Sequence, residues 1–537
     1  MKSHLFAAAA AALVLCASPV GAADLNLSLA NAINDQAFNH SQIPTTAECL
    51  TDRIGGRMTN SPAMRQAERW TQDQFKGWGL ANVHTEGFEF GRGWWIESAS
   101  VRMTAPRPLV LRSIPVAWTP ATSGVLSAPV IVAPMGKVRD FADWKGKLSG
   151  KIVLVSWPGP PKDLTDPPFK RYTPEDLTKE QPYRQPAFDP TALDRGIENR
   201  RFAAQLDAFL KAEGAVAWVR MSYRPGGLVT GEGSLYRVGQ TPALPGVEIA
   251  QEDYRRLARL AKTGPVTLEI NSNVHFEDAD TKAYNVIAEI PGADPKAGYV
   301  MAGAHLDSWV AADGATDNGA GSVVVLEAAR ILKTLGVKPK RTVRFALWSG
   351  EEQGLLGSAA YVEQHMAKRP ADPDPARQSM GPMVTHNTFP VTPLPGYREL
   401  AGYFNLDNGS GKVRGIYVEG NMAAAPILKD WIGPYANLGV TTVSAAPTGG
   451  TDHVLMARIG LPAYQFIQDP LDYDSTTHHS AVDTYDHLRI EDLKQAAAVM
   501  AWTLMQAADA KDPLPAGVVP TKPDAADPFA YPDPREK

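Results

Sequence analysis

Five side chains that could bind a metal ion or transfer a proton lie close together in the middle of this 537-residue chain: His305, Asp307, Asp317, Glu351 and Glu352. Histidine and carboxylates, without a thiolate, are the ligands that zinc uses in hydrolytic sites that keep a position open for water. A single His-x-Asp or Glu-Glu pair in a loop is usually a solvated surface feature. Here each group follows an apolar run or precedes a helix, so the joint arrangement indicates a metal site.

The elements around these residues are typical of a βαβ unit. Residues 299–304 and 342–348 are short apolar runs that predict buried strands, and residues 319–335 repeat apolar side chains at helical spacing. Strands joined through a helix are parallel, and functional groups collect at their carboxyl ends. We therefore expect a mainly parallel sheet with the candidate groups along one edge. Asp317 is expected at the N-cap of the intervening helix.

Three later segments add to the candidate groups. A predicted strand, ELAGYFNL, ends at Asp407, and the segment TGGTDH places Asp452 and His453 before another predicted helix. The last segment, YDSTTHHSAVDT, contains the adjacent histidines His478 and His479. Two adjacent histidines cannot easily serve one metal ion, so one of them must be chosen.

The chain resembles the co-catalytic di-zinc exopeptidase family, which includes bacterial aminopeptidases, glutamate carboxypeptidase and carboxypeptidase Q. Five motifs carry the resemblance and occur in the order of the family: GAHLDS, GATDNGAG, LWSGEEQGLLGS, NLD and HHSAVDT. The resemblance implies an α/β fold with a mixed, mainly parallel sheet flanked by helices, two Zn²⁺ ions and a peptide substrate. In this family the histidine ligand stands four residues before the aspartate of Asp-Thr, which selects His479 over His478.

The resemblance also implies a role for each side chain. The expected metal ligands are His305, Asp317, Glu352, Asp407 and His479. Glu351 is expected to act as the general base, which takes a proton from water and passes it to the leaving amine. Asp307 is expected to bond the far ring nitrogen of His305. His453 and Asp452 are weaker candidates for substrate binding, and His453 could equally hold only its own loop.

Charge counting fits this assignment. Asp317 would bridge the two ions, with His305 and Asp407 on one side and Glu352 and His479 on the other. Three ligand carboxylates against two Zn²⁺ leave about one positive charge, which a metal-bound hydroxide would neutralise. Such a hydroxide is the nucleophile that the resemblance implies, because zinc lowers the pKa of bound water to about 7.

Changes in composition predict the domain boundaries. Residues 1–23 combine a lysine, an apolar run and small residues, as in a cleaved secretory signal. The β-rich residues 121–278 interrupt the catalytic domain and resemble the protease-associated insertion of the family. Residues 24–120 and 279–510 are then the two parts of the catalytic domain, and residues 511–537 form a proline-rich tail.

A proline-rich segment, residues 370–398, lengthens the connection between Glu352 and Asp407 to 55 positions. The family usually has about half of that. Proline excludes a regular helix or a central strand there. A surface excursion is therefore expected, which either is passive or shapes substrate entry.

Composition excludes several classes of protein. Only Cys49 remains after residue 23, so a disulfide within one chain is impossible. A net charge of −5 gives no general basic surface for nucleic acid. No apolar run after the signal approaches about 18 residues, so no membrane span is expected. The expected location is the periplasm or the extracellular space, and the oligomeric state stays open.

The resemblance implies a secreted zinc exopeptidase that removes N-terminal residues from peptides. A dipeptidase or carboxypeptidase of the same family is the nearest competing assignment, because these relatives share the same metal ligands. A glutaminyl-cyclase-like enzyme with a single zinc ion and an inactive binding relative stay open as well. All five ligand positions are filled here, which argues against a relative that has lost its metal.

Overall fold

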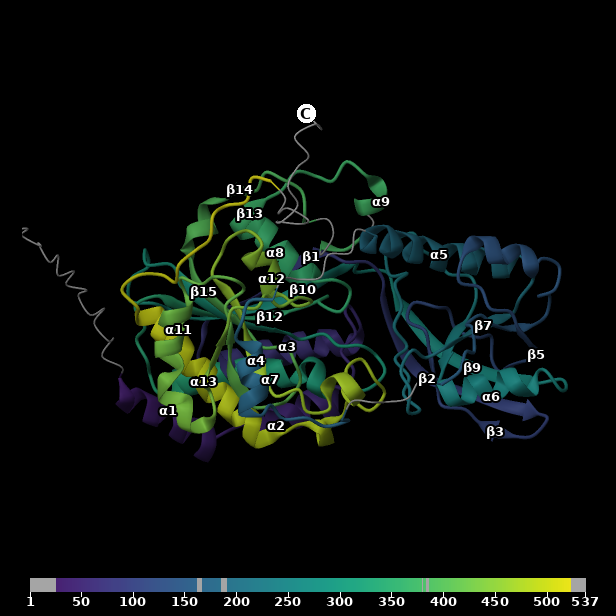
Figure 1. Ribbon diagram of the computed structural model, residues 1–537, viewed down its shortest axis with the longest axis horizontal. Helices are drawn as coiled ribbons and strands as arrows, with labels where there is room; N and C mark the ends of the chain where they lie inside the picture. Colours follow the sequence, from purple (N-terminus) through teal and green to yellow (C-terminus); the bar gives the residue numbers. More distant parts are fainter. Residues whose placement is uncertain (1–25, 162–166, 185–190, 379, 383–385, 523–537) are drawn as a thin grey trace, which may run out of the picture.

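Two lobes lie side by side in the computed structural model, and each is built on an eight-stranded sheet (Figure 1). The structure describes residues 26–161, 167–184, 191–378, 380–382 and 386–522. The predicted signal therefore lies outside the described residues. Within the described ranges, no helix is both long enough and apolar enough to cross a membrane.

The first sheet contains the predicted βαβ unit, in the strand order β1-β10-β12-β11-β15-β18-β16-β17. Its strands are β1 Ala81–Glu89, β10 Lys282–Ile290, β11 Tyr299–His305, β12 Thr342–Trp348, β15 Leu400–Asn405, β16 Val413–Tyr417, β17 Thr442–Ser444 and β18 Ala463–Gln468. The central strands β12, β11, β15 and β18 run parallel, and β17 runs parallel to β16. The antiparallel pairs are β1 with β10, β10 with β12 and β16 with β18. The predicted mixed, mainly parallel α/β sheet is confirmed.

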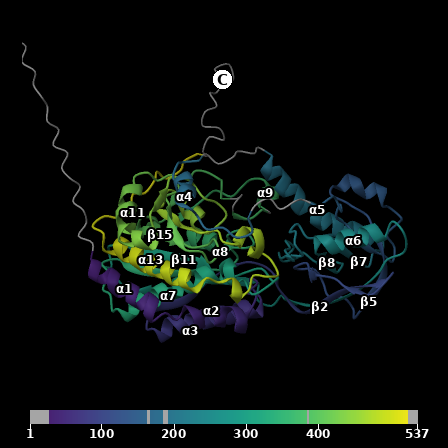
Figure 2. The same cartoon turned by 60° about the horizontal axis from the view of Figure 1, so that its bottom comes forward.

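Helices cover both faces of this sheet. On one face, α3 (Pro62–Gly77), α7 (Ala320–Thr334) and α13 (Ile490–Asp509) pack on the strands, and α1 (Leu27–Asn39) and α2 (Ile43–Glu48) pack on α7 and α13 (Figure 2). The short helices α8 (Leu356–Tyr361) and α12 (His453–Ala457) cover the other face, and α11 (Ala425–Ile432) packs beside β17. Because α7 lies between β11 and other helices, almost all of its side chains are buried.

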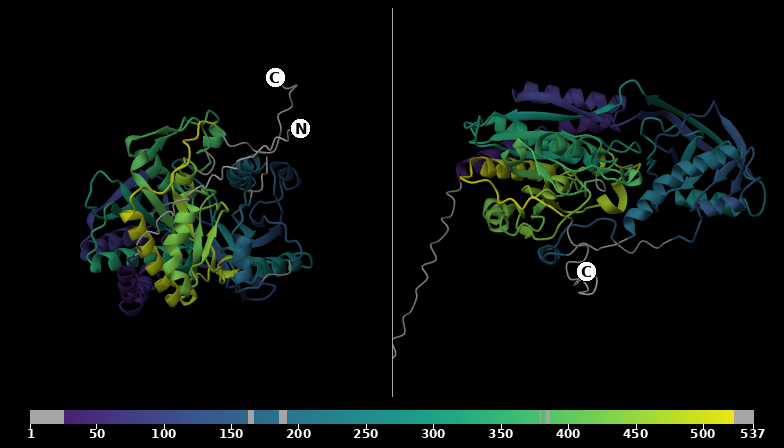
Figure 3. Two further views of the ribbon diagram at one scale, coloured as in Figure 1. Left: turned by 60° about the vertical axis from the view of Figure 1, so that its left-hand side comes forward. Right: turned by 90° about the horizontal axis from the view of Figure 1, so that it is seen from above.

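The second sheet has the order β3-β2-β9-β5-β6-β7-β8-β4. Its strands are β2 Gly93–Ala105, β3 Leu109–Val110, β4 Ser113–Pro115, β5 Leu126–Val132, β6 Ile152–Leu154, β7 Ala217–Met221, β8 Gly246–Ile249 and β9 Thr267–Glu277. We call residues 93–277 the inserted lobe. Its helices α5 (Ala192–Ala212) and α6 (Gln251–Leu260) lie in the same lobe as the sheet (Figure 3), and α6 contacts β7. The short helix α4 (Pro174–Glu180) instead packs near β17 of the first lobe.

The predicted start of this insertion at residue 121 is wrong. The long strand β2 pairs antiparallel with β9, from Gly93 with Glu277 to Ala105 with Thr267. This pairing draws β2 into the second sheet, because its hydrogen-bond partners lie more than 150 positions further along the chain. The strand β3 pairs with β2 and β4 pairs with β8, so residues 93–115 all belong to this sheet. The first sheet resumes with β10 at Lys282, close to the predicted boundary at residue 279.

The proline-rich segment contains only short elements in its described part. These are the four-residue helix α9 (Pro375–Gln378), the strand β14 (Thr392–Pro393) and a short 3-10 helix (Pro395–Glu399). The strand β14 pairs with β13 (Ala367–Lys368), which lies just before the segment. This agrees with the expectation that proline prevents a regular helix or central strand. The tail packs on the first lobe as far as it is described: Leu514 is buried, and its N–H donates to the carbonyl of Ala401 at 3.0 Å.

Candidate metal centre

The candidate residues meet where the parallel strands of the first sheet end. His305 is the last residue of β11, Asp407 follows β15, and Glu351 and Glu352 follow β12. His479 reaches the same edge from the loop before α13. The strand ends therefore bring together ligands that are separated by up to 174 positions in the sequence.

Asp317 does not occupy the predicted N-cap position. It lies in the turn Ala315–Gly319, and Gly319 is the N-cap of α7. The backbone of Asp317 is extended, with φ −129° and ψ 91°, and its carboxylate faces two histidines instead of the free N–H groups of the helix. Gly314 begins this turn in the left-handed region, at φ 59°, which glycine adopts without strain.

The two carboxylate oxygens of Asp317 face two different histidine–carboxylate pairs. His305 Nε2 lies 3.3 Å from Asp317 Oδ1 and 3.2 Å from Asp407 Oδ1. On the other side, His479 Nε2 lies 3.4 Å from Asp317 Oδ2 and 2.9 Å from Glu352 Oε2. This is the arrangement of a carboxylate that can bridge two metal ions.

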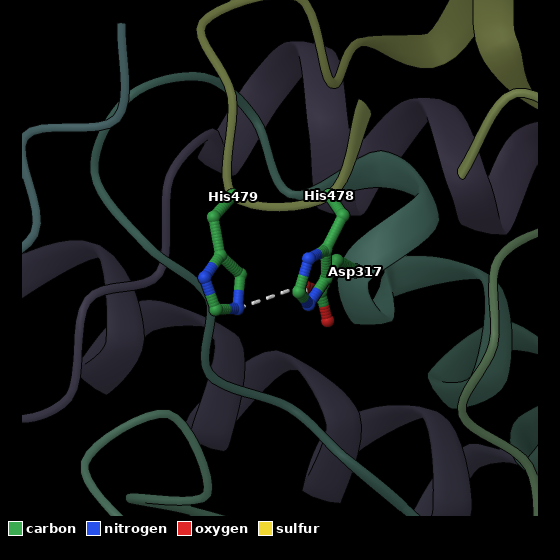
Figure 4. A group of neighbouring side chains, drawn as sticks. All are labelled: Asp317, His478 and His479. Carbon is green, nitrogen blue, oxygen red and sulfur yellow. Dashed lines mark ion pairs between the residues drawn. The ribbon is translucent and has the colours of Figure 1, made fainter. Parts of the chain in front are cut away.

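The distances to Asp317 and Glu352 distinguish the two adjacent histidines. Figure 4 shows both rings beside Asp317. His478 Nε2 lies 3.8 Å from Asp317 Oδ2, whereas His479 is nearer and also contacts Glu352. The ring of His478 stacks on that of His479 at 3.9 Å and packs against Tyr473 at 4.9 Å. The shorter distances favour His479 as the ligand, although ligand atoms of Asp317, His478 and His479 all lie within 4.8 Å of one another.

The donor set fits a divalent metal. Asp317 Oδ2 and Glu352 Oε1 are buried without a hydrogen-bond partner among the described residues, which costs free energy unless a cation satisfies them. Ligand atoms of His305, Asp317 and Glu352 lie within 4.8 Å of one another, as do those of His305, Glu351 and Asp407. Nitrogen and oxygen ligands without a thiolate are those of hydrolytic zinc sites.

The pKa shifts of the buried carboxylates also favour a bound cation. Burial raises the pKa of Glu351 well above its ordinary value; His305 opposes this shift, and Asp407 adds to it. Burial also raises the pKa of Glu352, and the charge of Asp317 adds to this effect. Burial would raise the pKa of Asp317 too, but the combined effect of His305, His479 and His478 outweighs burial and lowers it. A cation among these carboxylates would relieve their mutual repulsion.

The carboxylate of Asp307 does not make the expected close contact with the far ring nitrogen of His305. The Nδ1 atom of His305 lies 2.9 Å from the backbone carbonyl of Asp307, and its carboxylate oxygen is further away, at 3.7 Å. The carboxylate instead accepts the backbone N–H groups of Glu351 at 3.3 Å and Glu352 at 3.4 Å, and the hydroxyl of Thr59 at 2.8 Å. Asp307 therefore holds the segment with the candidate base and a candidate ligand.

The contacts of Asp452 and His453 favour the view that these residues hold their loop. His453 is fully buried, and its Nε2 atom lies 2.9 Å from the hydroxyl of Thr448 and 3.1 Å from the carboxylate of Glu419. Asp452 accepts the hydroxyl of Ser358 at 2.5 Å. Both side chains are fully buried.

Sequence reasoning missed two groups that hold the backbone of the site. The guanidinium of the fully buried Arg57 donates to the carbonyls of Leu306 and Gly314, each at 2.8 Å. Asp483 accepts the backbone N–H of Asp317 at 3.0 Å. The partners of Arg57 lie about 250 positions away, so no local pattern identifies this role. For Asp483, its place in the Asp-Thr motif was a signal.

Comparison with known proteins shows similarity to peptidases. Residues 285–504 match the model of peptidase family M28. Carboxypeptidase Q of Bos taurus is 27% identical over 471 residues, which cover 87% of this chain and 85% of the relative.

Two solved structures have a similar fold. A peptidase M28 precursor from Shewanella amazonensis aligns with a TM-score of 0.63 at 23% identity, over 93% of this chain and 99% of the other. A zinc aminopeptidase from Bacillus subtilis aligns with a TM-score of 0.54 at 19% identity, over 91% and 98%. At these identities the likeness concerns the fold.

Proposed function

We propose that this metallo-exopeptidase, whose residues 285–504 match the model of peptidase family M28, is an exported, zinc-dependent enzyme that hydrolyses N-terminal residues from peptides. The observation that supports this most directly is the position of Asp317 between two histidine–carboxylate pairs. The pattern of residues 1–23 supports export.

Two zinc ions are proposed, which Asp317 would bridge. His305 and Asp407 would hold one ion, and Glu352 and His479 the other. Bound zinc would act as a Lewis acid towards the scissile carbonyl and would lower the pKa of a water molecule. All five side chains project from strand ends or adjoining loops of a rigid sheet, so the site is largely preformed.

Glu351 is proposed as the general base. It lies beside the pair of His305 and Asp407, and it is not part of the contacts that link Asp317 to His479. Its carboxylate can therefore take a proton from the attacking water and deliver it to the leaving amine. Burial favours its protonated form, which suits the second of these steps.

The test uses one dipeptide in three forms: free, N-acetylated and C-terminally amidated. Each is incubated with the purified mature enzyme before and after treatment with a chelator, and after zinc is restored. Cleavage of the free and amidated forms, but not of the acetylated form, is expected of an enzyme that reads the α-amine. Zinc content measured on the same sample should be two ions per chain.

Different cleavage patterns would identify a different activity. Cleavage of the acetylated form but not of the amide would indicate a carboxypeptidase, and cleavage of the free form alone a dipeptidase. Extensive similarity to carboxypeptidase Q makes these two activities the nearest competitors of the proposal. If no form is cleaved in a chelator-sensitive way, the peptidase proposal fails, and a glutaminyl-cyclase-like or binding role takes its place.

A further inference from the structure

We infer that Glu232 of the inserted lobe is a positioning residue for the candidate metal ligand His479, so that the two lobes form the metal centre jointly. The inference rests on the metal centre proposed above. Glu232 lies outside the matched residues 285–504, in the connection between β7 and β8 of the second sheet. The inference assigns the inserted lobe a direct part in the site.

The contact of Glu232 with His479 is direct. Glu232 Oε1 lies 2.8 Å from His479 Nδ1, and the opposite ring nitrogen, Nε2, lies 2.9 Å from Glu352 Oε2. A neutral imidazole has one N–H and one lone pair. If Nδ1 donates its hydrogen to Glu232, the lone pair of Nε2 faces Glu352 and Asp317, as a zinc ligand requires. Glu232 therefore selects the tautomer that can bind metal.

The carboxylate itself is held in place. The hydroxyl of Tyr223 donates to the same oxygen, Glu232 Oε1, at 2.8 Å. Two aromatic rings also contact the imidazole of His479: His478 stacks on it at 3.9 Å, and Trp309 approaches it edge-on at 6.0 Å, both between ring centroids. The hydrogen bond to Glu232 and these ring contacts restrict the rotation of His479.

The backbone that carries Glu232 is packed too closely to shift easily. A side chain on the following residue, Gly233, would place its Cβ 2.2 Å from the carbonyl of Ala117, so only glycine allows this approach. The carbonyl of Glu232 accepts a hydrogen bond from Arg220 at 2.7 Å. Arg220 in turn pairs with the buried Glu248 at 2.6 Å. Glu232 thus projects from a fixed part of the inserted lobe.

A second contact joins the same two segments. The N–H of Ala481 donates to the carbonyl of Val229 at 2.9 Å, two residues beyond His479 and three before Glu232. His479 has a left-handed backbone, at φ 58°, which a residue other than glycine seldom adopts. Contacts on both sides of this turn hold it in place. The inserted lobe therefore orients both the backbone and the ring of the ligand.

The experiment measures zinc binding by chelator competition with the full-length mature protein. Removal of such an acceptor typically weakens metal binding by about 10- to 100-fold, which is the loss expected for Glu232→Ala. Glu232→Gln should lose less, because its amide oxygen still accepts the Nδ1 hydrogen but carries no charge. The absorption spectrum of the cobalt(II)-substituted protein should also change in Glu232→Ala, because the orientation of His479 changes.

The matched control is Glu97→Ala. Glu97 makes a similar carboxylate–histidine contact, at 2.6 Å to His275, on exposed surface of the inserted lobe. This variant should bind zinc as the unchanged protein does. Tyr223→Phe removes only the donor to Glu232 and should weaken zinc binding slightly; with Glu232→Gln it provides the test if Glu232→Ala does not fold.

Zinc affinity and a cobalt spectrum unchanged in Glu232→Ala would overturn the inference. If that variant does not fold, unchanged zinc affinity in both Glu232→Gln and Tyr223→Phe would overturn it. If instead the unchanged protein binds no zinc, the proposed metal centre itself is wrong. The two failures are therefore distinguishable, and neither depends on the peptide that the enzyme prefers.

Discussion

Replacement of Asp307 by asparagine tests how the fold holds the candidate base and its neighbouring ligand. The carboxylate of Asp307 accepts the N–H groups of Glu351 and Glu352 and the hydroxyl of Thr59. Asparagine has the same shape, but one of its two terminal atoms is a donor. Whichever way the amide is oriented, an N–H or hydroxyl donor would then face another donor.

The magnitude follows from the loss of one hydrogen bond to a charged acceptor. Such a bond contributes about 1.5–3 kcal/mol, and its donor is left buried. At about 1.4 kcal/mol for each factor of ten, the cost corresponds to roughly 10- to 150-fold. If the displaced segment carries this cost into the bound state, zinc affinity should fall by up to that factor. The kcat should fall as well, because Glu351 moves together with Glu352.

The assay combines chelator competition for zinc with kcat and KM at saturating zinc. The control is Asp294→Asn, because exposed Asp294 also accepts a backbone N–H, from Lys296 at 2.9 Å, but lies away from the site. Zinc affinity and kcat of the control should be unchanged. If Asp307→Asn also kept both values, the argument that Asp307 holds this segment would be refuted.

Three further predictions concern catalysis, packing and pH. Glu351→Gln should retain zinc while kcat falls by about 10²- to 10⁴-fold, the range for a general base, and full activity would show that another group is the base. A Cβ on Gly321 would lie 2.3 Å from the carbonyl of Leu406, so Gly321→Ala should lower the free energy of unfolding by about 1–3 kcal/mol. The control Gly264→Ala has open space around its Cβ and should not lower it. Equal melting temperatures of the two variants would contradict this prediction. Burial raises the pKa of Glu68 to about 7, so between about pH 4.5 and 7 the folded state keeps a proton that the unfolded state has released. Stability contributed by this group is therefore lost as pH rises through that window, and Glu68→Gln should flatten the fall in melting temperature; an unchanged slope would argue against the shift.

Much of the first lobe could be predicted from the sequence. The apolar runs at residues 299–304 and 342–348 became β11 and β12, and the helical pattern at residues 319–335 became α7. Local periodicity was sufficient because these elements are almost completely buried, so their apolar pattern is strong. The predicted resemblance to the metallo-exopeptidases is likewise confirmed, because residues 285–504 match the model of peptidase family M28.

The start of the inserted lobe could not be predicted in the same way. Residues 93–115 contain the strands β2, β3 and β4, but a strand pattern does not say which sheet a strand joins. That choice depended on β9, whose residues follow most of the inserted lobe in sequence. Similarly, the short polar side chain of Asp317 suggested a helix cap, and only the positions of His305 and His479 show where its carboxylate points.

The sequence by itself determined the chemistry that is available: histidine and carboxylate side chains without thiolates, placed after buried strands in an order that resembles the zinc exopeptidases. Residue type and local periodicity carry this information, because they depend on neighbours within a few positions. Only the tertiary structure decided which groups hold the ligands. Arg57, Asp307 and Glu232 act through partners on distant segments, and hydrogen bonds between such segments exist only once the two sheets have formed and packed together.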